Sequence, residues 1–487
     1  MDHHTKLIRG AAVVTVDPAL GVLETGDVLV EGDTIAAVAP ALDAPPAAQV
    51  VDGRGHILIP GLINAHLHAW QTTVRGMGMN WSGVEHHLRM QSQFVPALTP
   101  EDLGHAEFVG AANLLDGGVT SVLEWCHGNR TPEHSDAALD GLRRAGVRGV
   151  FAHGTVKTLP RDGEPHFSQV PHPRAEAKRL RAVLDGDPLL TLALGVLGPD
   201  YAPIEVCRQD FGLARELDVL TTAHVSGHPG KVPDGYRRIV AEGLLTGPHN
   251  VVHATAMADD ELRLLLDHGA SITATSSVEV NGGFREPVIG RVLALGGRPS
   301  IGTDSETATA ADMFAAMRDS LTIQRLFDHH AAQRAAGVRP GRAATNQVAR
   351  GMPVPPRKTP SSYDALRWAT LDNARALGID ALVGSITPGK RADLVLLRGT
   401  DLNLTPALNP VDAAVGFAHP GNVDTVLVAG RTVKSGGVLR ARAAAQAAGA
   451  ALRERAERLL ATLGLADLRD STGTRPVPPG PGHPAGS

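Results

Sequence analysis

The strongest constraint on the fold is an alternation between apolar, strand-like runs and helical stretches, which begins near residue 60 and continues to residue 304. Helical stretches such as 205–217 and 259–268 separate the runs. Short apolar runs that alternate with helices are typical of parallel α/β folds, in which each helix returns the chain to the same end of the sheet. Eight such runs predict a (β/α)₈ barrel. The predicted barrel strands are 61–68, 119–125, 148–154, 189–197, 220–225, 250–255, 270–276 and 299–304.

Both ends of the chain have a different pattern of secondary-structure signals. Residues 6–59 and 385–440 contain short β-rich runs bounded by Gly or Asp, and these runs lack the intervening helices of the barrel region. We therefore expect a small β-sandwich domain built from both chain ends. The predicted organisation is 1–59 for the first half of that domain, 60–384 for the barrel, 385–440 for the second half, 441–466 for a C-terminal helix and 467–487 for a disordered tail rich in Pro and Gly.

Composition excludes several classes of protein. The net charge is 46 − 51 = −5, so a nucleic-acid partner is not expected. Two cysteines, Cys126 and Cys207, rule out a disulfide scaffold and suit the cytoplasm, which is the expected location. The sequence contains no apolar run of about 18 residues and no signal-peptide core at its N-terminus, so no membrane association is expected.

The strongest local motif is His66-Leu67-His68 at the end of the first predicted barrel strand. Alternate residues of a strand point to the same side, so the two imidazoles project together toward the C-terminal mouth of the barrel, where barrel active sites lie. That arrangement suits a divalent metal. By itself a His-x-His pair is weak evidence, because buried histidines are more often structural.

Further polar residues stand at the ends of other predicted strands. His224 ends the fifth strand, His253 the sixth and Asp304 the eighth. Each of these residues taken alone is readily explained as a hydrogen-bonded core residue. Several metal ligands or proton carriers at the same end of one barrel make that structural explanation improbable for the whole set.

Three sequence segments resemble one family in the same order along the chain. The opening Pro60-Gly61-Leu62-Ile63-Asn64-Ala65-His66-Leu67-His68 with Arg75-Gly76, the segment Gly302-Thr303-Asp304 with Asp312-Met313-Phe314, and Pro388-Gly389-Lys390-Arg391-Ala392-Asp393 are all similar to the amidohydrolase superfamily. The branch is that of chlorotriazine hydrolases and the S-adenosylhomocysteine, guanine and cytosine deaminases. The resemblance spans roughly residues 6–460.

This resemblance implies one divalent metal ion per chain, zinc or iron, held by His66, His68, His224 and Asp304. It also implies that Asp304 accepts the proton of the attacking water and that His253 hydrogen-bonds the water or the developing oxyanion. A divalent metal lowers the pKa of water to about 7, and a nearby carboxylate can then take the proton. Relatives commonly form dimers or larger assemblies, so a homo-oligomer is expected.

One departure from the deaminase pattern concerns the leaving group. Deaminating relatives carry a glutamate three residues after the histidine of the fifth strand, and here that position is Gly227. His228 is the nearest substitute for this proton shuttle, although an uninvolved loop histidine is an equal expectation. Glu279 and Glu306, on predicted loops, are further candidates for the missing acid.

Several other residues are candidates for substrate contacts, and each has a structural alternative. Trp70 could instead serve packing, Arg75 could instead form a structural salt bridge, and the loop acids could simply be solvated. Of Glu124 and His127, one is expected to face the cavity and the other to serve the fold. The histidines at 86 and 87 are expected at the surface. The candidate substrate-binding residues are Trp70, Gln71, Arg75, Glu124, Asp200 and Glu306.

The leading hypothesis is a metal-dependent hydrolase of a C–N bond in a small, nitrogen-rich cyclic compound, with deamination as the reaction. The second hypothesis keeps the metal barrel but assigns another leaving group, a decarboxylation or an elimination, because Gly227 replaces the usual acid. A non-catalytic binding barrel is the third, and the joint presence of five strand-end ligands and proton carriers argues against it.

Overall fold

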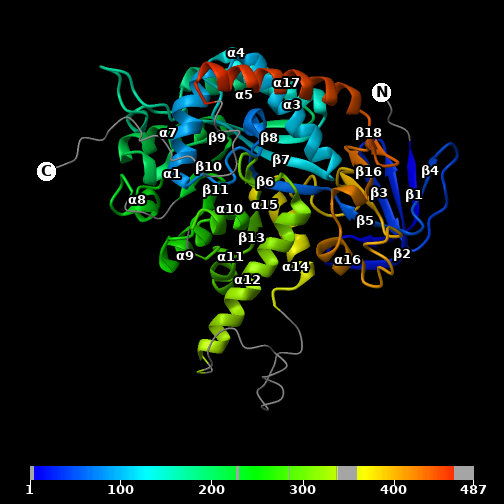
Figure 1. Cartoon of the computed structure of the whole chain (residues 1–487). Coiled ribbons are helices and arrows are strands. Elements are labelled where there is room, and N and C mark those ends of the chain that lie inside the picture. The colour runs from blue at the N-terminus through cyan, green and yellow to red at the C-terminus, as the bar shows by residue number, and fades with distance from the viewer. Residues whose placement is uncertain (1–4, 226–229, 284–285, 336, 338–358, 466–487) are drawn as a thin grey trace.

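The computed structural model describes residues 5–225, 230–283, 286–335, 337 and 359–465. Two predictions fall outside this part of the chain, namely the shuttle role of His228 and the disordered tail at 467–487. The described residues form two nine-stranded sheets, of which one is a barrel and the other belongs to a separate β domain (Figure 1).

The barrel confirms the predicted (β/α)₈ fold. Neighbouring barrel strands run parallel, and the order β13-β12-β11-β10-β9-β8-β7-β6-β14 follows the chain. The predicted eighth strand is broken into two pieces, and the second piece pairs with β6. The strands are β6 (Leu62–His68), β7 (Val119–Cys126), β8 (Arg148–Gly154), β9 (Leu190–Gly195), β10 (Leu220–Val225), β11 (His249–His253), β12 (Ser271–Ala274), β13 (Pro299–Ile301) and β14 (Asp304–Ser305).

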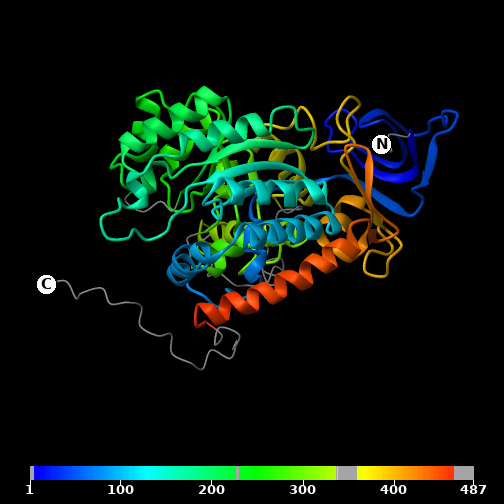
Figure 2. The ribbon, with the colours of Figure 1, turned by 90° about the horizontal axis from the view of Figure 1, so that it is seen from above.

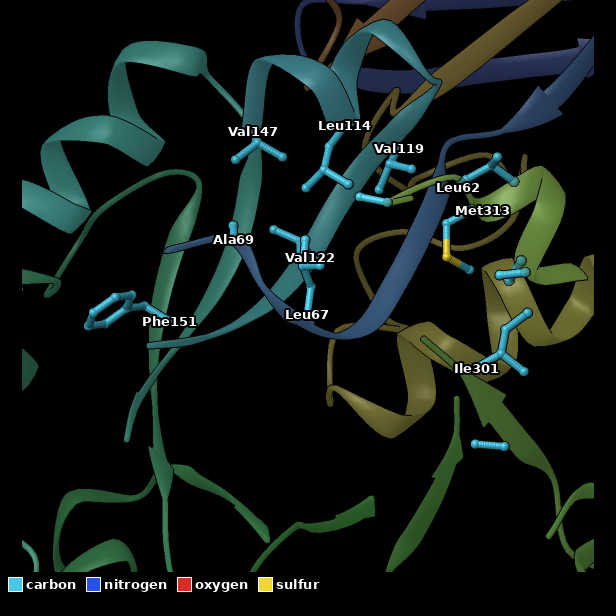
Figure 3. Packing of buried hydrophobic residues seen from close by; sticks show 14 of the residues in the cluster. Leu62, Leu67, Ala69, Leu114, Val119, Val122, Val147, Phe151, Ile301 and Met313 are labelled. Carbon is cyan, nitrogen blue, oxygen red and sulfur yellow. The ribbon is translucent and has the colours of Figure 1, made fainter. Parts of the chain in front are cut away.

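Helices cover the outer face of the barrel, and apolar residues of strands and helices pack there (Figure 3). Leu114 of α3 lies with Val119 and Val122 of β7 in this outer cluster. No helix in the described segments is both long enough and apolar enough to span a bilayer. The covering helices are α3 (Pro100–Asp116), α4 (Pro132–Ala145), α5 (Arg174–Val183), α7 (Ile204–Leu217), α8 (Gly235–Ala241), α9 (Asp259–Asp267), α11 (Ile289–Ala294), α12 (Met313–Ala335) and α14 (Ser362–Arg367). Helix α15 (Asn373–Ala376) packs against the interior of the barrel instead, through Ala374.

The interior of the barrel is filled by a second apolar cluster. Ile63, Leu123, Val150, Ala193 and Val252 come from five different strands and belong to this cluster. The barrel is therefore a packed core below its mouth, and chemistry is confined to the ends of the strands.

Strands from both chain ends share the second sheet, because β5 pairs with β15 in antiparallel register. Gly61 alone separates β5 from the first barrel strand, so the two sheets are joined without a linker. The strands are β1 (Lys6–Val14), β2 (Val22–Glu31), β3 (Thr34–Ala39), β4 (Gln49–Asp52), β5 (His56–Pro60), β15 (Leu394–Arg398), β16 (Val423–Val428), β17 (Arg431–Ser435) and β18 (Val438–Leu439).

Two contacts hold the β domain and the last helix against the barrel. The Arg148 guanidinium of β8 forms a buried ion pair with Asp393, with 2.9 Å between Nε and Oδ2. Helix α17 (Arg442–Thr462) crosses the molecule beside α3 (Figure 2), and its Arg455 donates a 2.9 Å hydrogen bond to Asp102. Helix α17 is thereby held against α3 on the outside of the barrel.

Candidate metal centre

In the first barrel strand, β6, the alternation of inward-facing and outward-facing side chains is interrupted near the histidine pair. Ala65 belongs to the interior cluster but Leu67 belongs to the outer cluster, although strict alternation would place both on one face. The pairing of β6 with β7 shifts register between Asn64 and Leu67, which is the signature of a β-bulge. The shift lets His66 and His68 face the mouth of the barrel while the strand below them still packs the core.

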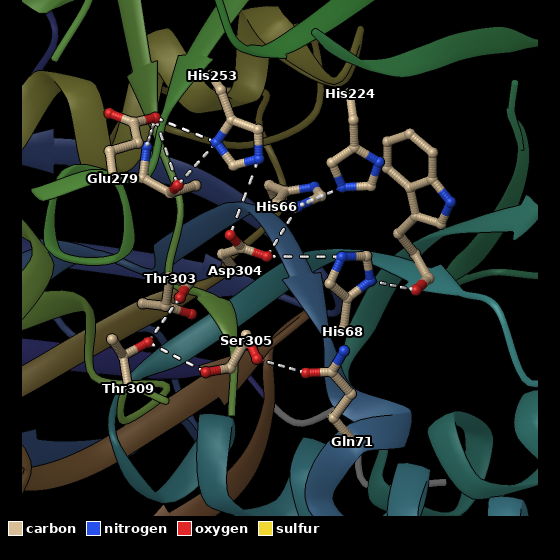
Figure 4. A network of polar contacts seen from close by, with 12 residues as sticks. His66, His68, Gln71, His224, His253, Glu279, Thr303, Asp304, Ser305 and Thr309 are labelled. Carbon is tan, nitrogen blue, oxygen red and sulfur yellow. Dashed lines mark hydrogen bonds and ion pairs between the residues drawn. The ribbon is translucent and has the colours of Figure 1, made fainter. Parts of the chain in front are cut away.

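Four side chains from three parts of the barrel converge at this mouth (Figure 4). His66 Nε2 lies 3.3 Å from His224 Nε2 and 3.4 Å from Asp304 Oδ1. His68 Nε2 lies 3.5 Å from the same Asp304 oxygen. The structure thus brings together all four predicted metal ligands, with three imidazole nitrogens and one carboxylate facing a common space.

Two ligand rings are held from behind by Trp125 of β7. The His68 Nδ1–H donates a 2.7 Å hydrogen bond to the Trp125 carbonyl, which leaves the Nε2 lone pair directed at the common space. The indole stacks on the His224 ring with 3.9 Å between centroids. Gly154 and Gly195 make room for the indole, because a Cβ atom at either position would lie within 2.7 Å of Trp125 Nε1.

Burial sets the charge of these groups. It lowers the pKa of His66, lowers that of His68 to about 3 and lowers that of His224 well below its usual value, so all three imidazoles are neutral near pH 7. Burial alone would raise the pKa of Asp304, but the hydrogen bond with His66 and the surrounding imidazoles hold it below its usual range. Neutral imidazoles and an ionised carboxylate are the states that metal ligation requires.

These residues fit a divalent metal ion. Two imidazole nitrogens, His66 Nε2 and His224 Nε2, face each other at 3.3 Å, and ligand atoms of His66, His68 and His224 lie within 4.8 Å of one another. Among the described residues, Nδ1 of both His66 and His224 has no hydrogen-bond partner. Three imidazoles with one carboxylate form a donor set that zinc and iron both accept.

The break in the eighth strand aims Asp304 at the centre. Asp304 has φ of 63° and His253 has φ of 73°, which place both residues in the left-handed region that side chains rarely adopt. Such conformations cost about 1–3 kcal/mol each and persist where the surroundings enforce them. Gly302 permits the break, because a Cβ atom there would lie 2.6 Å from the His66 carbonyl oxygen.

We expect Gly302→Ala to destabilise the fold by about 1–3 kcal/mol and to reduce metal binding, because the added methyl group would push β13 away from His66. Thermal unfolding and elemental analysis measure the two effects. Gly212→Ala in α7, where nothing lies within 4 Å of the added Cβ, is the matched control. Wild-type metal content and stability in Gly302→Ala would contradict the prediction.

His253 and Glu279 form a relay beside Asp304. His253 Nδ1 lies 3.2 Å from Glu279 Oε1, and His253 Nε2 lies 3.9 Å from Asp304 Oδ2. Burial acts against the charged imidazole, but the Glu279 hydrogen bond and the charges of Asp304 and Glu279 outweigh it and raise the pKa of His253. Glu279 lies on α10 (Ser276–Asn281) rather than on a loop, and it is completely buried. It therefore orients His253 instead of replacing the acid absent at Gly227.

The predicted substrate residues divide into two groups. Trp70 and Gln71 are buried on η1 (Ala69–Val74), where the Trp70 ring meets the His68 ring edge-on and Gln71 Oε1 accepts a 2.6 Å hydrogen bond from Ser305. Asp200 lies on the short helix α6 (Gly198–Tyr201) after β9, at the mouth of the barrel. These three residues lie around the centre, and their role as substrate contacts stays a prediction.

Arg75 and Glu306 pair with each other, which matches the salt-bridge alternative for Arg75 and ties up Glu306, a candidate for substrate binding and for the missing acid. The Arg75 guanidinium lies 2.8 Å from Glu306 Oε1, and Thr72 donates a further hydrogen bond to Glu306. The Glu306 side chain is 1% exposed, so a carboxylate tied to a guanidinium and shielded from solvent is not presented as a shuttle or a substrate ligand. The ion pair instead fastens η1 to the loop that follows Asp304.

Glu124 likewise serves the scaffold, through a buried pair with Glu107 of α3. Its Oε2 accepts a 2.6 Å hydrogen bond from the Ala69 amide, directly behind His68. Burial raises the pKa of Glu124 to about 8 and raises that of Glu107 well above its usual value. The two carboxyl groups hence retain protons at neutral pH.

This pair contributes to the free energy of unfolding a term that falls as pH rises. Between the unfolded pKa of 4.5 and the folded pKa of about 8, the folded state binds more protons than the unfolded state. Each group that keeps its proton then costs up to about 1.4 kcal/mol of stability per pH unit. We expect Glu107→Gln to flatten this slope in urea unfolding curves recorded from pH 5 to 8, whereas Glu31→Gln at an exposed position should keep it. Identical slopes in wild type and Glu107→Gln would refute the role of the pair.

Some site residues escaped the sequence analysis. His86, expected at the surface, reaches Ser305 beside Asp304, with 3.2 Å between His86 Nε2 and Ser305 Oγ. For Trp125, the only feature of the sequence that could have indicated a role in the site was its position at the end of a predicted strand. Glu279 was a candidate acid, but its partner His253 lies 26 residues away in the sequence, and only the fold joins them.

A cavity of about 310 Å³ lies beside the centre, on the side of the seventh and eighth strands. Thr275 and Thr303 line it, and these residues are neighbours of the relay and of Asp304. None of the four converging ligands lines the cavity, so it adjoins the centre without containing it.

The chain is similar to known proteins over most of its length. The model of the amidohydrolase family matches residues 57–433. The chain is 28% identical over 446 residues to a 5-methylthioadenosine/S-adenosylhomocysteine deaminase of Symbiobacterium thermophilum, with coverage of 88% of this chain and 93% of that protein. It is 27% identical over 449 residues to a 5'-deoxyadenosine deaminase of Methanothermobacter thermautotrophicus, with coverage of 90% and 95%.

Solved structures share the fold over nearly the whole chain. An adenosine deaminase of Xanthomonas campestris with bound zinc superposes with a TM-score of 0.75 at 24% identity, over 93% of this chain and 98% of that one. An atrazine chlorohydrolase of Arthrobacter aurescens in complex with zinc superposes with a TM-score of 0.74 at 19% identity, over 92% and 99%.

Proposed function

The chain belongs to the amidohydrolase family, and from that premise we propose that it is a zinc-dependent aminohydrolase that removes an amino group from a small, nitrogen-rich ring. The observation that carries this proposal is the convergence of His66, His68, His224 and Asp304 at the barrel mouth, with His253 beside them. The deaminases among the relatives support the reaction.

In this proposal each residue of the centre has a defined role. His66, His68, His224 and Asp304 hold the metal, which when bound supplies Lewis acidity and lowers the pKa of water to about 7. Asp304, an ionised carboxylate, accepts the proton as water attacks the ring carbon. His253 donates a hydrogen bond from Nε2 to the oxygen that gains charge, and Glu279 fixes its ring by accepting from Nδ1.

The proton for the leaving nitrogen needs a donor, because an unprotonated amide ion leaves poorly. Asp304 can return the proton that it has taken, and His228 is the proposed shuttle in place of the acid missing at Gly227. Its unperturbed pKa near 6.5 suits transfer at neutral pH. A cytoplasmic location and a homo-oligomeric state belong to the same proposal; the two free, buried cysteines support the first, and the family resemblance supports the second.

A second candidate function is hydrolysis of a different leaving group at the same centre. Gly227 favours it, because a leaving group that departs as an anion, such as chloride, needs no protonation. One structural neighbour is a chlorohydrolase, which supports including such substrates in the test.

The test incubates zinc-loaded enzyme with matched amino and chloro derivatives of adenine nucleosides, pyrimidines and triazines, and measures released ammonia and chloride. Ammonia from an amino ring supports the aminohydrolase. Chloride without ammonia favours the second candidate. Release of neither ion by fully metal-loaded enzyme contradicts both.

A further inference from the structure

Lys157 is a buried lysine at the same mouth of the barrel as the metal centre. It follows β8 by three residues and is 8% exposed. Its Nζ lies 4.6 Å from the centroid of the Tyr201 ring, on the helix that follows the next barrel strand. Two consecutive strand-to-helix connections therefore enclose one ammonium group.

Lys157 differs from the other buried lysines in its partners. The buried lysines of the described chain are Lys6, Lys157 and Lys434. Lys6 donates to the Gly430 carbonyl at 3.0 Å, and Lys434 donates to the Asp116 carbonyl and pairs with its carboxylate at 2.8 Å. Lys157 forms no hydrogen bond or ion pair with any residue that the structure describes, and its contact is the aromatic face of Tyr201.

The charge of Lys157 acts on the metal centre. It contributes, after burial, to the lowered pKa of His224 and of His127. His127 directly follows β7 and is 3% exposed, and the centroid of its ring lies 5.9 Å from that of His224. Neither ring nitrogen of His127 has a partner among the described residues. Among the described residues, a lysine and an imidazole that both lack a hydrogen-bond partner thus act on one predicted metal ligand, His224.

A buried charge without a counter-charge is costly, and proteins normally pair such charges. The Tyr201 face compensates part of that cost, since a cation over an aromatic ring gains about 0.5–2 kcal/mol. Burial lowers the pKa of Lys157 to about 8, and no acidic group acts on it to raise the pKa again. The ammonium still dominates at neutral pH, and none of the residues that the structure describes supplies an anionic partner for it.

We propose that Lys157 binds a carboxylate of the substrate, with His127 as a second hydrogen-bond donor, so that the ring hydrolysed at the metal centre carries an anionic substituent. This inference rests on the proposed function, because it takes the metal centre as the place of reaction. A carboxylate fits the ammonium as a charge-assisted hydrogen bond and supplies the absent negative charge.

The experiment compares two probes that differ only in charge, 4-aminopyrimidine-5-carboxylate and its 5-carboxamide, together with the corresponding pair of aminopyridines. Calorimetry measures their binding to zinc-loaded wild type, Lys157→Met and Lys157→Arg. Lys178→Met is the matched control, because Lys178 is an exposed lysine of α5 that pairs with Glu216 of α7. Metal content and melting temperature are recorded for every variant.

We expect the wild type to prefer the carboxylate by about tenfold or more, as one hydrogen bond to a charged group predicts. Lys157→Met should reduce that ratio to about one, Lys157→Arg should retain part of it, and Lys178→Met should leave it unchanged. An equal ratio in wild type and Lys157→Met, or the absence of binding by every carboxylate at millimolar concentration, would overturn the proposal.

Ammonia release in the same samples separates this inference from the proposed function. Lysine-dependent binding of the carboxylate without ammonia supports the subsite and counts against the aminohydrolase. Ammonia release from the carboxylate-bearing rings with equal kcat/KM in wild type and Lys157→Met supports the aminohydrolase and overturns the subsite.

Discussion

Replacement of His66 by alanine should reduce the bound divalent metal from about one ion per chain to almost none. His66 is completely buried, and its Nε2 lies within 3.4 Å of two other ligand atoms, so no solvent molecule or neighbouring side chain can take its place without rearrangement. Elemental analysis of dialysed wild type and His66→Ala measures the effect, and turnover should be lost together with the metal.

The matched control for this variant is His249→Ala. His249 is a buried histidine on barrel strand β11, but it bonds Tyr236 and Thr221 below the mouth, away from the centre. The His249→Ala variant should be less stable than the wild type but should keep its metal. Equal metal content in wild type and His66→Ala would remove His66 from the ligand set, and metal loss in both variants would point to unfolding as the cause.

Replacement of Asp304 by asparagine should lower kcat by about 10²–10⁴-fold while most of the metal is retained at saturating zinc. The amide keeps an oxygen of the same size at the same place, but it cannot accept the proton of the attacking water. The loss should persist across pH 5–8, because the low pKa of Asp304 keeps the wild-type carboxylate ionised throughout that range.

Steady-state kinetics on the amino ring with the highest turnover, with metal analysis of the same samples, checks this prediction. Asp312→Asn is the control, because Asp312 lies on the following loop and caps α12 by accepting from the Phe314 amide at 2.8 Å. Wild-type turnover in fully loaded Asp304→Asn would show that another group takes the proton.

Local sequence was enough to predict the barrel and the place where its strand-end polar residues meet. Hydrophobic alternation is a property of neighbouring residues, and it placed eight strands whose structural bounds differ from the predicted ones by a few residues. Because parallel strands all end at the same mouth, polar residues at the ends of 61–68, 220–225 and 299–304 converge there once the order of the strands is known. This rule nominated His66, His68, His224, His253 and Asp304 as candidate ligands or proton carriers, and the family resemblance then divided these roles among them.

Tertiary structure decided what each polar group near the centre does. Arg75 and Glu306 are 231 residues apart, and His253 and Glu279 are 26 apart, so their pairing depends on packing that no local pattern encodes. Burial then fixed the charge of each group. It left Glu124 protonated behind His68 and left Lys157 with no anionic partner among the described residues, because desolvation depends on the whole surrounding volume and not on the neighbours in sequence.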